Sequence, residues 1–504
     1  MKSVLPRDVR KALDLLAADP AVEHSTGALA AVCGVAPRTL QKHFRQFLDR
    51  SPREVQSALR MERARRDLLI GAPDASVTDV ALRWGFRHLG RFAMLYRRRY
   101  DESPSATLRY RSSVAARESP LAPSLRRAGD RPMVGILPFA FIGADARQAA
   151  VIVEEIAAAL CRNRWLALGP PDSARYRLRG TIQADTAGRL RAVVMLIDVS
   201  TGRYLWADRW DGGLDDCFAF QGRVAASVTR AIARSVRDAE IDLASRKAAT
   251  EPLNPWQLTM RAFPHALSIE AAAQAQALEL LDQAMELAPV DALPAALAAW
   301  CHGQRGGHCF TARPALEKEA ARQLAARAAR LNAGDPMVEA LVGAAYTLAH
   351  DLAPATRHFE RALALDGACV WAWNRSGWVS VYHGNASEAI ERFQIACSIA
   401  PDDPLSFFCT IGIAAAHFEA ARYEESAHWF TRGLAEHPSA VWVNRFRAPA
   451  YALAGRKREA HESLAELARL YPDLTIADVR SALPNTPSFL DRQAEGLEAA
   501  GMRP

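Results

Sequence analysis

Apolar residues recur at helical spacing twice within residues 28–109, and a glycine interrupts the pattern each time. The first copy reads ALAAVCGVAPRTLQKHFRQFLDRSP and the second reads DVALRWGFRHLGRFAMLYRRRYDESP. In both copies a short apolar helix precedes the glycine and an arginine-bearing helix follows it. The charged helical run REVQSALRMERARRDLL separates them. The pattern predicts two helix-turn-helix units in tandem, each able to place its second helix in a major groove of duplex DNA.

The hydrophobic period changes at residue 132. MVGILPF has a β pattern, AAVIVEEIAAALCRN is helical, and YRLRGTIQA, GRLRAVVMLIDV and GRYLWADRWDG alternate as strands do. Glycine-containing turns, 186–188 and 200–202, join these strands, and a helix over about residues 218–246 follows. We therefore expect a small α+β domain over residues 132–248, preceded by a Ser- and Pro-rich linker over residues 113–131.

Residues 253–504 are alanine-rich and repeat with the 34-residue period of tetratricopeptide units. Small and aromatic residues take the same positions in consecutive units, which are Gly377, Ala389, Phe393 and Ala396 in one and Gly343, Ala355, Phe359 and Ala362 in the unit before it. Further units end at Pro438 and Pro472, a weaker one ends at Pro289, and a degenerate one fills Leu293 to Ala333. About five or six such repeats predict an α-solenoid whose concave face binds a peptide or another protein. The expected fold class is therefore multidomain and mainly α.

Charge is distributed unevenly along the 504 residues, whose net charge is +7. Residues 1–111 hold 21 Lys and Arg against 12 Asp and Glu, whereas the remainder holds 42 against 44. The basic surplus therefore belongs to the tandem-helix region, as polyanion binding requires. Eight scattered cysteines imply no disulfide framework, and no secretory signal or run of 18 apolar residues is present. We expect a cytoplasmic protein that does not contact a membrane.

The first unit, over residues 28–52, exposes polar side chains on its second helix. Leu40, Phe44 and Phe47 occupy its core face, which leaves the opposite face for DNA contacts through Arg38, Thr39, Gln41, Lys42 and Arg45. Arginine and lysine donate to guanine, and glutamine pairs with adenine. A solvated helix face explains the same side chains, and the basic surplus favours the DNA hypothesis.

The second unit, over residues 79–104, offers a different surface. With Phe92, Leu95 and Tyr96 on the core face, the exposed set is Arg87, His88, Leu89, Gly90, Arg91, Met94, Arg97 and Arg98. We expect Arg91 to read a base and the two apolar side chains to contact thymine methyl groups. The other arginines and His88 are expected to hold phosphates.

Residues 1–112 resemble the DNA-binding domain of the AraC family of transcriptional regulators. The tail WGFRHLGRF…YRRRYDESPSATLR is very similar to the signature of that family. The resemblance implies that Arg38, Gln41 and Lys42 contact bases from the first recognition helix, and that Arg91 and its neighbours do so from the second. This sequence departs from the family at Asp49 and Asp101, where glycine is common, and in placing the domain first.

Residues 132–248 resemble the small α+β domain of the amino-terminal part of TolB. VGILPF and LIDVSTGRYLWADRWDGGLDDCFAFQ carry this resemblance, which implies a non-catalytic sensing or coupling module. We accordingly predict no enzymatic activity and no cofactor. A nucleotide- or metal-dependent enzyme in this domain is the weakest of the three alternatives.

Two clusters have the residue types of metal sites. Cys301, His302, His308 and Cys309 offer thiols and imidazoles, but their spacing differs from common zinc motifs, and an irregular glycine loop between repeat helices explains them as well. Asp208, Asp211, Asp215 and Asp216 could bind magnesium, but capping of the next helix is the simpler role.

The sequence as a whole predicts a sequence-specific transcriptional regulator. Its partners are expected to be a promoter site in double-stranded DNA, and RNA polymerase or other proteins through the repeats, with a small-molecule or protein effector left open. The competing hypothesis is a tetratricopeptide interaction scaffold that binds DNA only nonspecifically.

Overall fold

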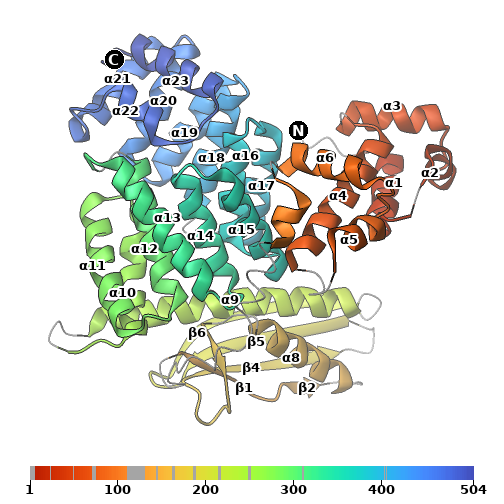
Figure 1. The fold of residues 1–504 in the computed structure, drawn as a ribbon. Coiled ribbons are helices and arrows are strands. Elements are labelled where there is room, and N and C mark those ends of the chain that lie inside the picture. Colours follow the sequence, from red (N-terminus) through yellow and green to blue (C-terminus); the bar gives the residue numbers. More distant parts are fainter. Residues whose placement is uncertain are drawn as a thin grey trace. The chain divides into compact units, whose positions relative to one another are not determined.

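The computed structural model describes residues 6–22, 24–48, 50–70, 75–100, 102–109, 131–142, 146–161, 165–184, 189–213, 217–247, 251–308, 311–401, 403 and 406–503. The chain forms two compact units, Met1–Pro120 and Leu121–Pro504, which we call unit 1 and unit 2 (Figure 1). None of the described helices is long and apolar enough to cross a membrane. Most of the predicted linker over residues 113–131 lies outside the described ranges.

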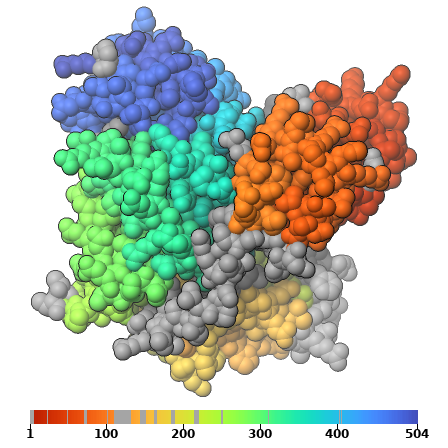
Figure 2. All heavy atoms as spheres, viewed as in Figure 1, coloured from red at the N-terminus to blue at the C-terminus, as the bar shows by residue number. Residues whose placement is uncertain are grey.

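Unit 1 is all-helical. Its helices are α1 (Arg7–Ala18), α2 (Thr26–Cys33), α3 (Pro37–Leu48), α4 (Pro52–Ile70), α5 (Val77–Arg83) and α6 (Leu89–Tyr100), followed by a helical turn over residues 104–109. Two separate apolar cores hold them, one around Leu40 and Phe44 and the other around Phe92 and Tyr96. Helix α4 packs its first turns on the former core and its later turns on the latter. It therefore joins two helical halves, which Figure 2 shows in red and orange.

Unit 2 begins with a six-stranded sheet of order β3-β1-β4-β5-β6, with β2 paired to β4. The strands are β1 (Met133–Ile136), β2 (Ala140–Ile142), β3 (Ala167–Leu168), β4 (Tyr176–Ala184), β5 (Arg189–Asp198) and β6 (Arg203–Gly213). The first three are parallel to the strands they pair with, whereas β4, β5 and β6 are antiparallel to one another. Sequence patterns predicted β1, β4, β5 and β6 but missed the short β2 and β3. The predicted turn over residues 186–188 lies outside the described residues.

Helices α8 (Ala146–Cys161) and α9 (Cys217–Arg246) share one apolar core with the sheet. Their buried side chains meet the alternating buried positions of β5, so both helices cover the same face. Helix α9 is 30 residues long, and its last turns reach the core of the helical repeats through Ala244. It therefore connects the sheet to the repeats, as α4 connects the two halves of unit 1.

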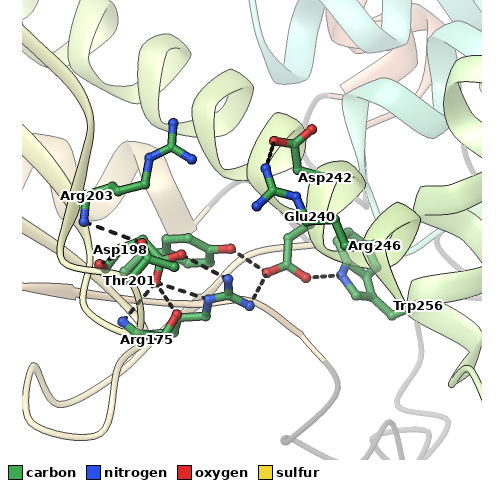
Figure 3. A network of polar contacts seen from close by, with 10 residues as sticks. Arg175, Asp198, Thr201, Arg203, Glu240, Asp242, Arg246 and Trp256 are labelled. Carbon is green, nitrogen blue, oxygen red and sulfur yellow. Dashed lines mark hydrogen bonds and ion pairs between the residues drawn. The ribbon is translucent and has the colours of Figure 1, made fainter. Parts of the chain in front are cut away.

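A polar network holds this connection (Figure 3). Tyr176 Oη donates to Glu240 Oε1 at 2.5 Å, and Trp256 Nε1 donates to Glu240 Oε2 at 2.8 Å. Arg175 lies between Glu240 and Asp198, 3.6 Å from the first carboxylate and 2.9 Å from the second. Burial raises the pKa of Asp198, but the hydrogen bonds that it accepts outweigh burial and lower its pKa below the ordinary value. One carboxylate thus ties a strand, α9 and the first repeat helix together.

Paired helices fill the rest of unit 2 and share one large core (Figure 1). They are α10 (Pro255–Leu267), α11 (Ala271–Leu287), α12 (Ala292–Gly307), α13 (Pro314–Leu331), α14 (Pro336–Leu348), α15 (Leu352–Leu365), α16 (Val370–Tyr382), α17 (Ala386–Ile399), α18 (Ser406–Glu419), α19 (Tyr423–Glu436), a 3-10 turn η2 (Val441–Val443), α20 (Asn444–Leu453), α21 (Lys457–Leu470), α22 (Ile476–Ala482) and α23 (Pro487–Ala499). At the predicted small positions the packing is tight, because a Cβ added to Gly377 would lie 2.8 Å from Phe393. The mainly α fold class with a small sheet and a repeat solenoid is confirmed.

The predicted glycine loop over residues 301–309 is wrong as far as Gly307, because α12 continues to that residue. A Cβ added to Gly303 would approach Leu348 to 3.0 Å, and one added to Gly307 would approach Leu483 to 3.3 Å. These glycines therefore allow neighbouring segments to pack directly on α12. Gly303 and Gly307 are therefore needed for close helix packing, and they do not form a turn.

The C-terminal helices return to the earlier repeats. Lys318 Nζ donates to the Ser481 carbonyl at 2.9 Å, and Arg445 donates to the Gly307 carbonyl at 3.2 Å. These partners are 163 and 138 residues apart in the sequence. The solenoid thus curves until its late helices contact its early ones.

Candidate DNA-binding surface

Helix α3 is fixed in unit 1 by its apolar face. Ser25 caps the preceding helix α2 by accepting the Ala28 amide hydrogen, and Gly34 ends α2 with φ 73°. That left-handed conformation favours glycine. Leu40 and Phe44 of α3 are fully buried beyond this turn. The predicted recognition helix therefore begins at Pro37, as the sequence indicated.

The opposite face of α3 holds the predicted polar residues. Thr39 is half-buried, whereas the other members of the set are exposed, namely Arg38, Gln41, Lys42 and Arg45. His43, which the sequence prediction did not use, forms a 2.7 Å contact with Asp8 of α1. That contact fixes the roll of α3 and so determines which side chains face outward.

Helix α6 is positioned in the same manner. Ser76 and Asp79 form a reciprocal capping box at the start of α5, and the hydrogen bonds from Ser76 lower the pKa of Asp79. Gly85 turns the chain with φ 77°, and a Cβ there would lie 3.1 Å from the Ala21 carbonyl. Phe92 is buried on the core face of α6.

The predicted outer set of the second unit is exposed throughout. Arg87 and His88 precede α6, and the members on the helix are Leu89, Gly90, Arg91, Met94, Arg97 and Arg98. The exposed fractions of Leu89 and Met94 are 40% and 63%, which are large values for apolar side chains. A helix face that shows both apolar and guanidinium groups to solvent can contact thymine methyl groups and guanine edges.

A buried polar network behind α6 was not predicted from the sequence. Arg65 of α4 donates to Glu102 at 2.9 Å and to the hydroxyl of Tyr96 at 3.2 Å. Thr107 donates to the same Glu102 oxygen at 2.8 Å, and Arg65 stacks over Tyr100 at 4.1 Å from the ring centre. The network links α4, α6 and the following helical turn. Arg65 lies on the apolar face of α4, and an arginine on such a face needs a buried partner. That position is the sequence signal that could have revealed the network.

Helix α4 also holds the segment between α1 and α2. Arg60 donates to the carbonyls of Pro20 and Ala21 at 2.6 and 3.1 Å, and Gln56 donates to the Val22 carbonyl at 2.5 Å. Since α4 packs on both cores, these bonds limit independent movement of the two halves. Two helices held by one rigid connector can present their outer faces in a fixed relation.

Three arginines on the outer faces have no competing partner among the residues of unit 1 that the structure describes. Arg38, Arg91 and Arg97 form no hydrogen bond or ion pair with any residue that the structure describes. Solvent therefore satisfies these guanidinium groups, and they are available to an external anion. Phosphates and guanine edges are the nucleic-acid groups that arginine binds.

The Cys and His cluster is dispersed in the structure. His302 contacts Glu317 at 2.6 Å, whereas His308 lies 3.1 Å from Arg445 Nη2, and burial raises the pKa of the Cys301 thiol. Cys309 lies outside the described residues. Within the described ranges, no group of three or more His, Cys, Asp or Glu is arranged to hold a metal ion.

The aspartate cluster is only partly described. Asp211 forms ion pairs with Arg191 at 2.6 Å and Arg209 at 3.6 Å, and Asp208 accepts the Arg209 amide hydrogen. Both aspartates lie within β6, inside the segment GRYLWADRWDG that the sequence predicted as a strand. Asp215 and Asp216, the predicted capping residues, lie outside the described residues.

Comparisons with known proteins support the pattern in unit 1. A family model described as a helix-turn-helix domain matches residues 29–110. The chain is 40% identical over 109 residues to a thc operon regulatory protein of Rhodococcus erythropolis, covering 21% of this chain and 33% of that protein. A solved AraC family regulator from Rhodopseudomonas palustris CGA009 is 31% identical, covering 21% of this chain and 98% of that one, with a TM-score of 0.21.

A further relative is a protein named as adenylate cyclase 3 of Rhizobium meliloti (strain 1021). It is 27% identical over 209 residues, covering 37% of this chain and 34% of the relative. The chain thus spans about a third of the length of these two curated relatives.

Two helix-turn-helix motifs with basic outer faces, joined by one shared helix, define unit 1 as a DNA-binding domain of the kind found in transcriptional regulators. More specifically, the N-terminal domain is an AraC-type helix-turn-helix domain, and tetratricopeptide-like repeats form the C-terminal helical region. The resemblance of residues 132–248 to the TolB domain stays a prediction.

Proposed function

We propose that the chain is a sequence-specific transcriptional regulator that reads duplex DNA with the outer faces of α3 and α6. The observation that carries the proposal is the set of exposed arginines on both helices that have no partner within the described residues. Both recognition helices enter successive major grooves, about 34 Å apart along one face of the DNA. The +9 surplus of residues 1–111 provides the attraction to phosphates.

The two helices divide the recognition between them in this proposal. Arg38, Gln41 and Lys42 of α3 hydrogen-bond base edges, so the first half-site supplies most of the discrimination. Arg91 of α6 reads one base, and Met94 contacts a thymine methyl group. Leu89 contacts a thymine methyl group as Met94 does, and Gly90 allows close approach to the groove. Phosphates are held by the remaining candidates, which are Thr39, Arg45, Arg87, His88, Arg97 and Arg98.

Unit 2 is proposed to sense a signal or to bind partner proteins, RNA polymerase among them, through its repeats. Solenoids of helical pairs commonly bind proteins on their concave surface. Here the late helices also hydrogen-bond to α12 and α13, so the two ends of the repeat region are held together. Unit 2 is therefore the part in which we place control of DNA binding.

Selection of binding sites from a random duplex library by the full chain tests the proposal. We expect one preferred sequence, bound about 10³-fold or more tightly than random DNA. Raising salt from about 50 to 200 mM should weaken binding by about 10³ to 10⁵, given about 6 to 10 phosphate contacts.

Arg38→Ala should lower the ratio of specific to random binding. The matched control is Arg458→Ala, which removes an exposed arginine from α21 in unit 2. Selection of no preferred sequence, with equal affinity for all duplexes, would refute the regulator proposal and support the interaction scaffold.

A further inference from the structure

The repeats contain a pocket of about 460 Å³ that is lined from both ends of the solenoid. Residues 267–271, at the first hairpin turn, form one side of it. Phe407 and Phe408 of α18, Trp442 of η2 and Tyr471 after α21 line other parts. Glu270, the acidic residue of the lining, is exposed. The volume falls in the range of small-molecule sites, and the aromatic lining suits a flat apolar group.

A buried cation, Arg375, stacks on Phe408, which lines the pocket, and is not itself part of the lining. The Arg375 guanidinium is 4.3 Å from the ring centre of Phe408 and 4.4 Å from that of Trp300. Arg375 is 8% exposed, and its Nε and Nη2 atoms have no hydrogen-bond partner. Among the described residues, no carboxylate pairs with it. Aromatic faces offset part of the cost of burying this charge, but they do not supply hydrogen-bond acceptors.

A second lining side chain, Trp442, also carries a hydrogen-bond donor without an acceptor. Trp442 is 5% exposed, and its indole Nε1 has no acceptor. The Arg445 guanidinium lies 5.6 Å from the ring centre of Trp442, and the His308 ring centre lies 4.6 Å from it. Two guanidinium groups therefore direct positive potential toward one aromatic pocket.

The cationic state of Arg375 persists at neutral pH. Burial lowers the pKa of Arg375 to about 9, which leaves the group protonated at pH 7. Burial also lowers the pKa of His308 well below its ordinary value, and the charges of Arg445 and Arg375 lower it further. The imidazole is accordingly neutral, and the two arginines supply the positive charge of the cluster.

We infer that the pocket between the first and last repeats binds a small aromatic carboxylate. Its ring lies against Phe407, Phe408 and Trp442, and its carboxylate is attracted by the positive charge of Arg375. The ligand brings a negative charge near Arg375, with which no carboxylate of the described residues pairs. A long peptide is less suited to this place, because the late helices already contact α12 and α13. Since the lining comes from both ends of the solenoid, the ligand joins those ends. The inference deepens the proposed function by giving unit 2 an effector.

Titration of the full chain with 2-naphthoate, followed by calorimetry and by tryptophan fluorescence, tests the inference. We expect saturable one-to-one binding and quenching of Trp442. The neutral analogue 2-naphthamide and inorganic phosphate should each bind at least tenfold more weakly, because one lacks the charge and the other lacks the ring. Equal binding of 2-naphthamide, or no saturable binding of 2-naphthoate, would overturn the inference.

Arg375→Met replaces the buried cation with an apolar side chain of similar length, and should weaken 2-naphthoate at least tenfold while leaving 2-naphthamide unchanged. Arg375→Lys should retain part of the affinity. If Arg375→Met does not fold, Trp442→Phe removes the indole N–H together with part of the aromatic surface, and should weaken 2-naphthoate several-fold more than it weakens 2-naphthamide. Unchanged 2-naphthoate affinity in whichever of these variants folds would contradict the inference, as would tighter binding of an acidic peptide that 2-naphthoate does not displace.

Site-specific DNA binding is measured on the same preparations. Loss of sequence preference with 2-naphthoate binding intact refutes the proposed function alone. Site-specific DNA binding without 2-naphthoate binding refutes the effector inference alone.

Discussion

Arginine serves opposite purposes on the recognition helices and inside the repeats. Arg91 is exposed on α6 and Arg375 is 8% exposed in the solenoid, yet neither has a carboxylate partner among the described residues. Water solvates the first at no cost, whereas the second is held only between aromatic rings. Arg65 is a third case, because it is buried and paired with Glu102. Burial therefore decides what a missing partner means. Water satisfies an exposed arginine until DNA replaces it, whereas a buried arginine keeps an uncompensated charge unless a ligand offsets it.

Arg65→Met should produce the largest loss of stability in this comparison. It leaves the buried Glu102 carboxylate without its cation, a change that costs about 3 to 5 kcal/mol. Chemical denaturation followed by circular dichroism would measure the free energy of unfolding of unit 1. Arg66→Met, an exposed neighbour on α4, is the matched control and should change it by less than about 0.5 kcal/mol. Equal losses in both variants would show that the buried pair has no special role.

Arg91→Ala should have the next largest effect, on DNA discrimination. Loss of one bidentate contact to a base costs about 1 to 3 kcal/mol at that position and relaxes the choice of base there. Affinities for the selected site and for its three single-base variants at each position would measure the change. Equal loss on selected and random DNA would contradict base reading by Arg91.

The buried His308, which lies beside Arg445, should make the stability of unit 2 depend on pH. Its folded-state pKa lies below that of the unfolded chain, so the unfolded chain binds more protons once the pH falls below about 6.5. The stability contributed by neutral His308 is thus present above that pH and is lost as the pH falls toward the folded-state pKa. The free energy of unfolding of unit 2 should fall between about pH 7.5 and pH 5.5 in the unchanged chain. In His308→Gln we expect this fall to be smaller by about 1 kcal/mol. Identical drops would mean that His308 protonates as easily in the folded state as in the unfolded one.

Arg97→Ala should have the smallest effect. Removal of one phosphate contact weakens binding to all duplexes alike and lowers the salt slope by about 0.9. Affinities measured at four salt concentrations on selected and random DNA would show it. A change confined to the selected sequence would assign base contacts to Arg97 as well.

Local patterns were sufficient to predict much of this fold. The helical period and Gly34 and Gly85 located both helix-turn-helix motifs, and alternation located the long strands β4, β5 and β6. The exposed faces of α3 and α6 followed from the positions of Leu40 and Phe92 in their apolar stripes. These features depend on neighbours in the sequence, which is why a single sequence revealed them.

Features that depend on distant residues were missed. The Arg65 to Glu102 pair joins residues 37 apart, and Arg445 contacts the Gly307 carbonyl across 138 residues. Gly303 was taken for part of a loop, because a glycine that permits close helix packing has the same sequence appearance as one in a turn. The buried charge of Arg375 was equally invisible, since burial follows from the curvature of the solenoid. Which bases the exposed side chains contact stays a prediction.

Hydroxyl-radical footprinting of the full chain on its selected site tests the central claim most directly, that α3 and α6 each read one half-site. We predict two protected segments about one helical turn apart. Arg38→Ala should weaken protection mainly in one segment and Arg91→Ala mainly in the other, while Arg458→Ala changes neither. A single protected segment, or equal weakening of both segments by each recognition-helix variant, would contradict the account.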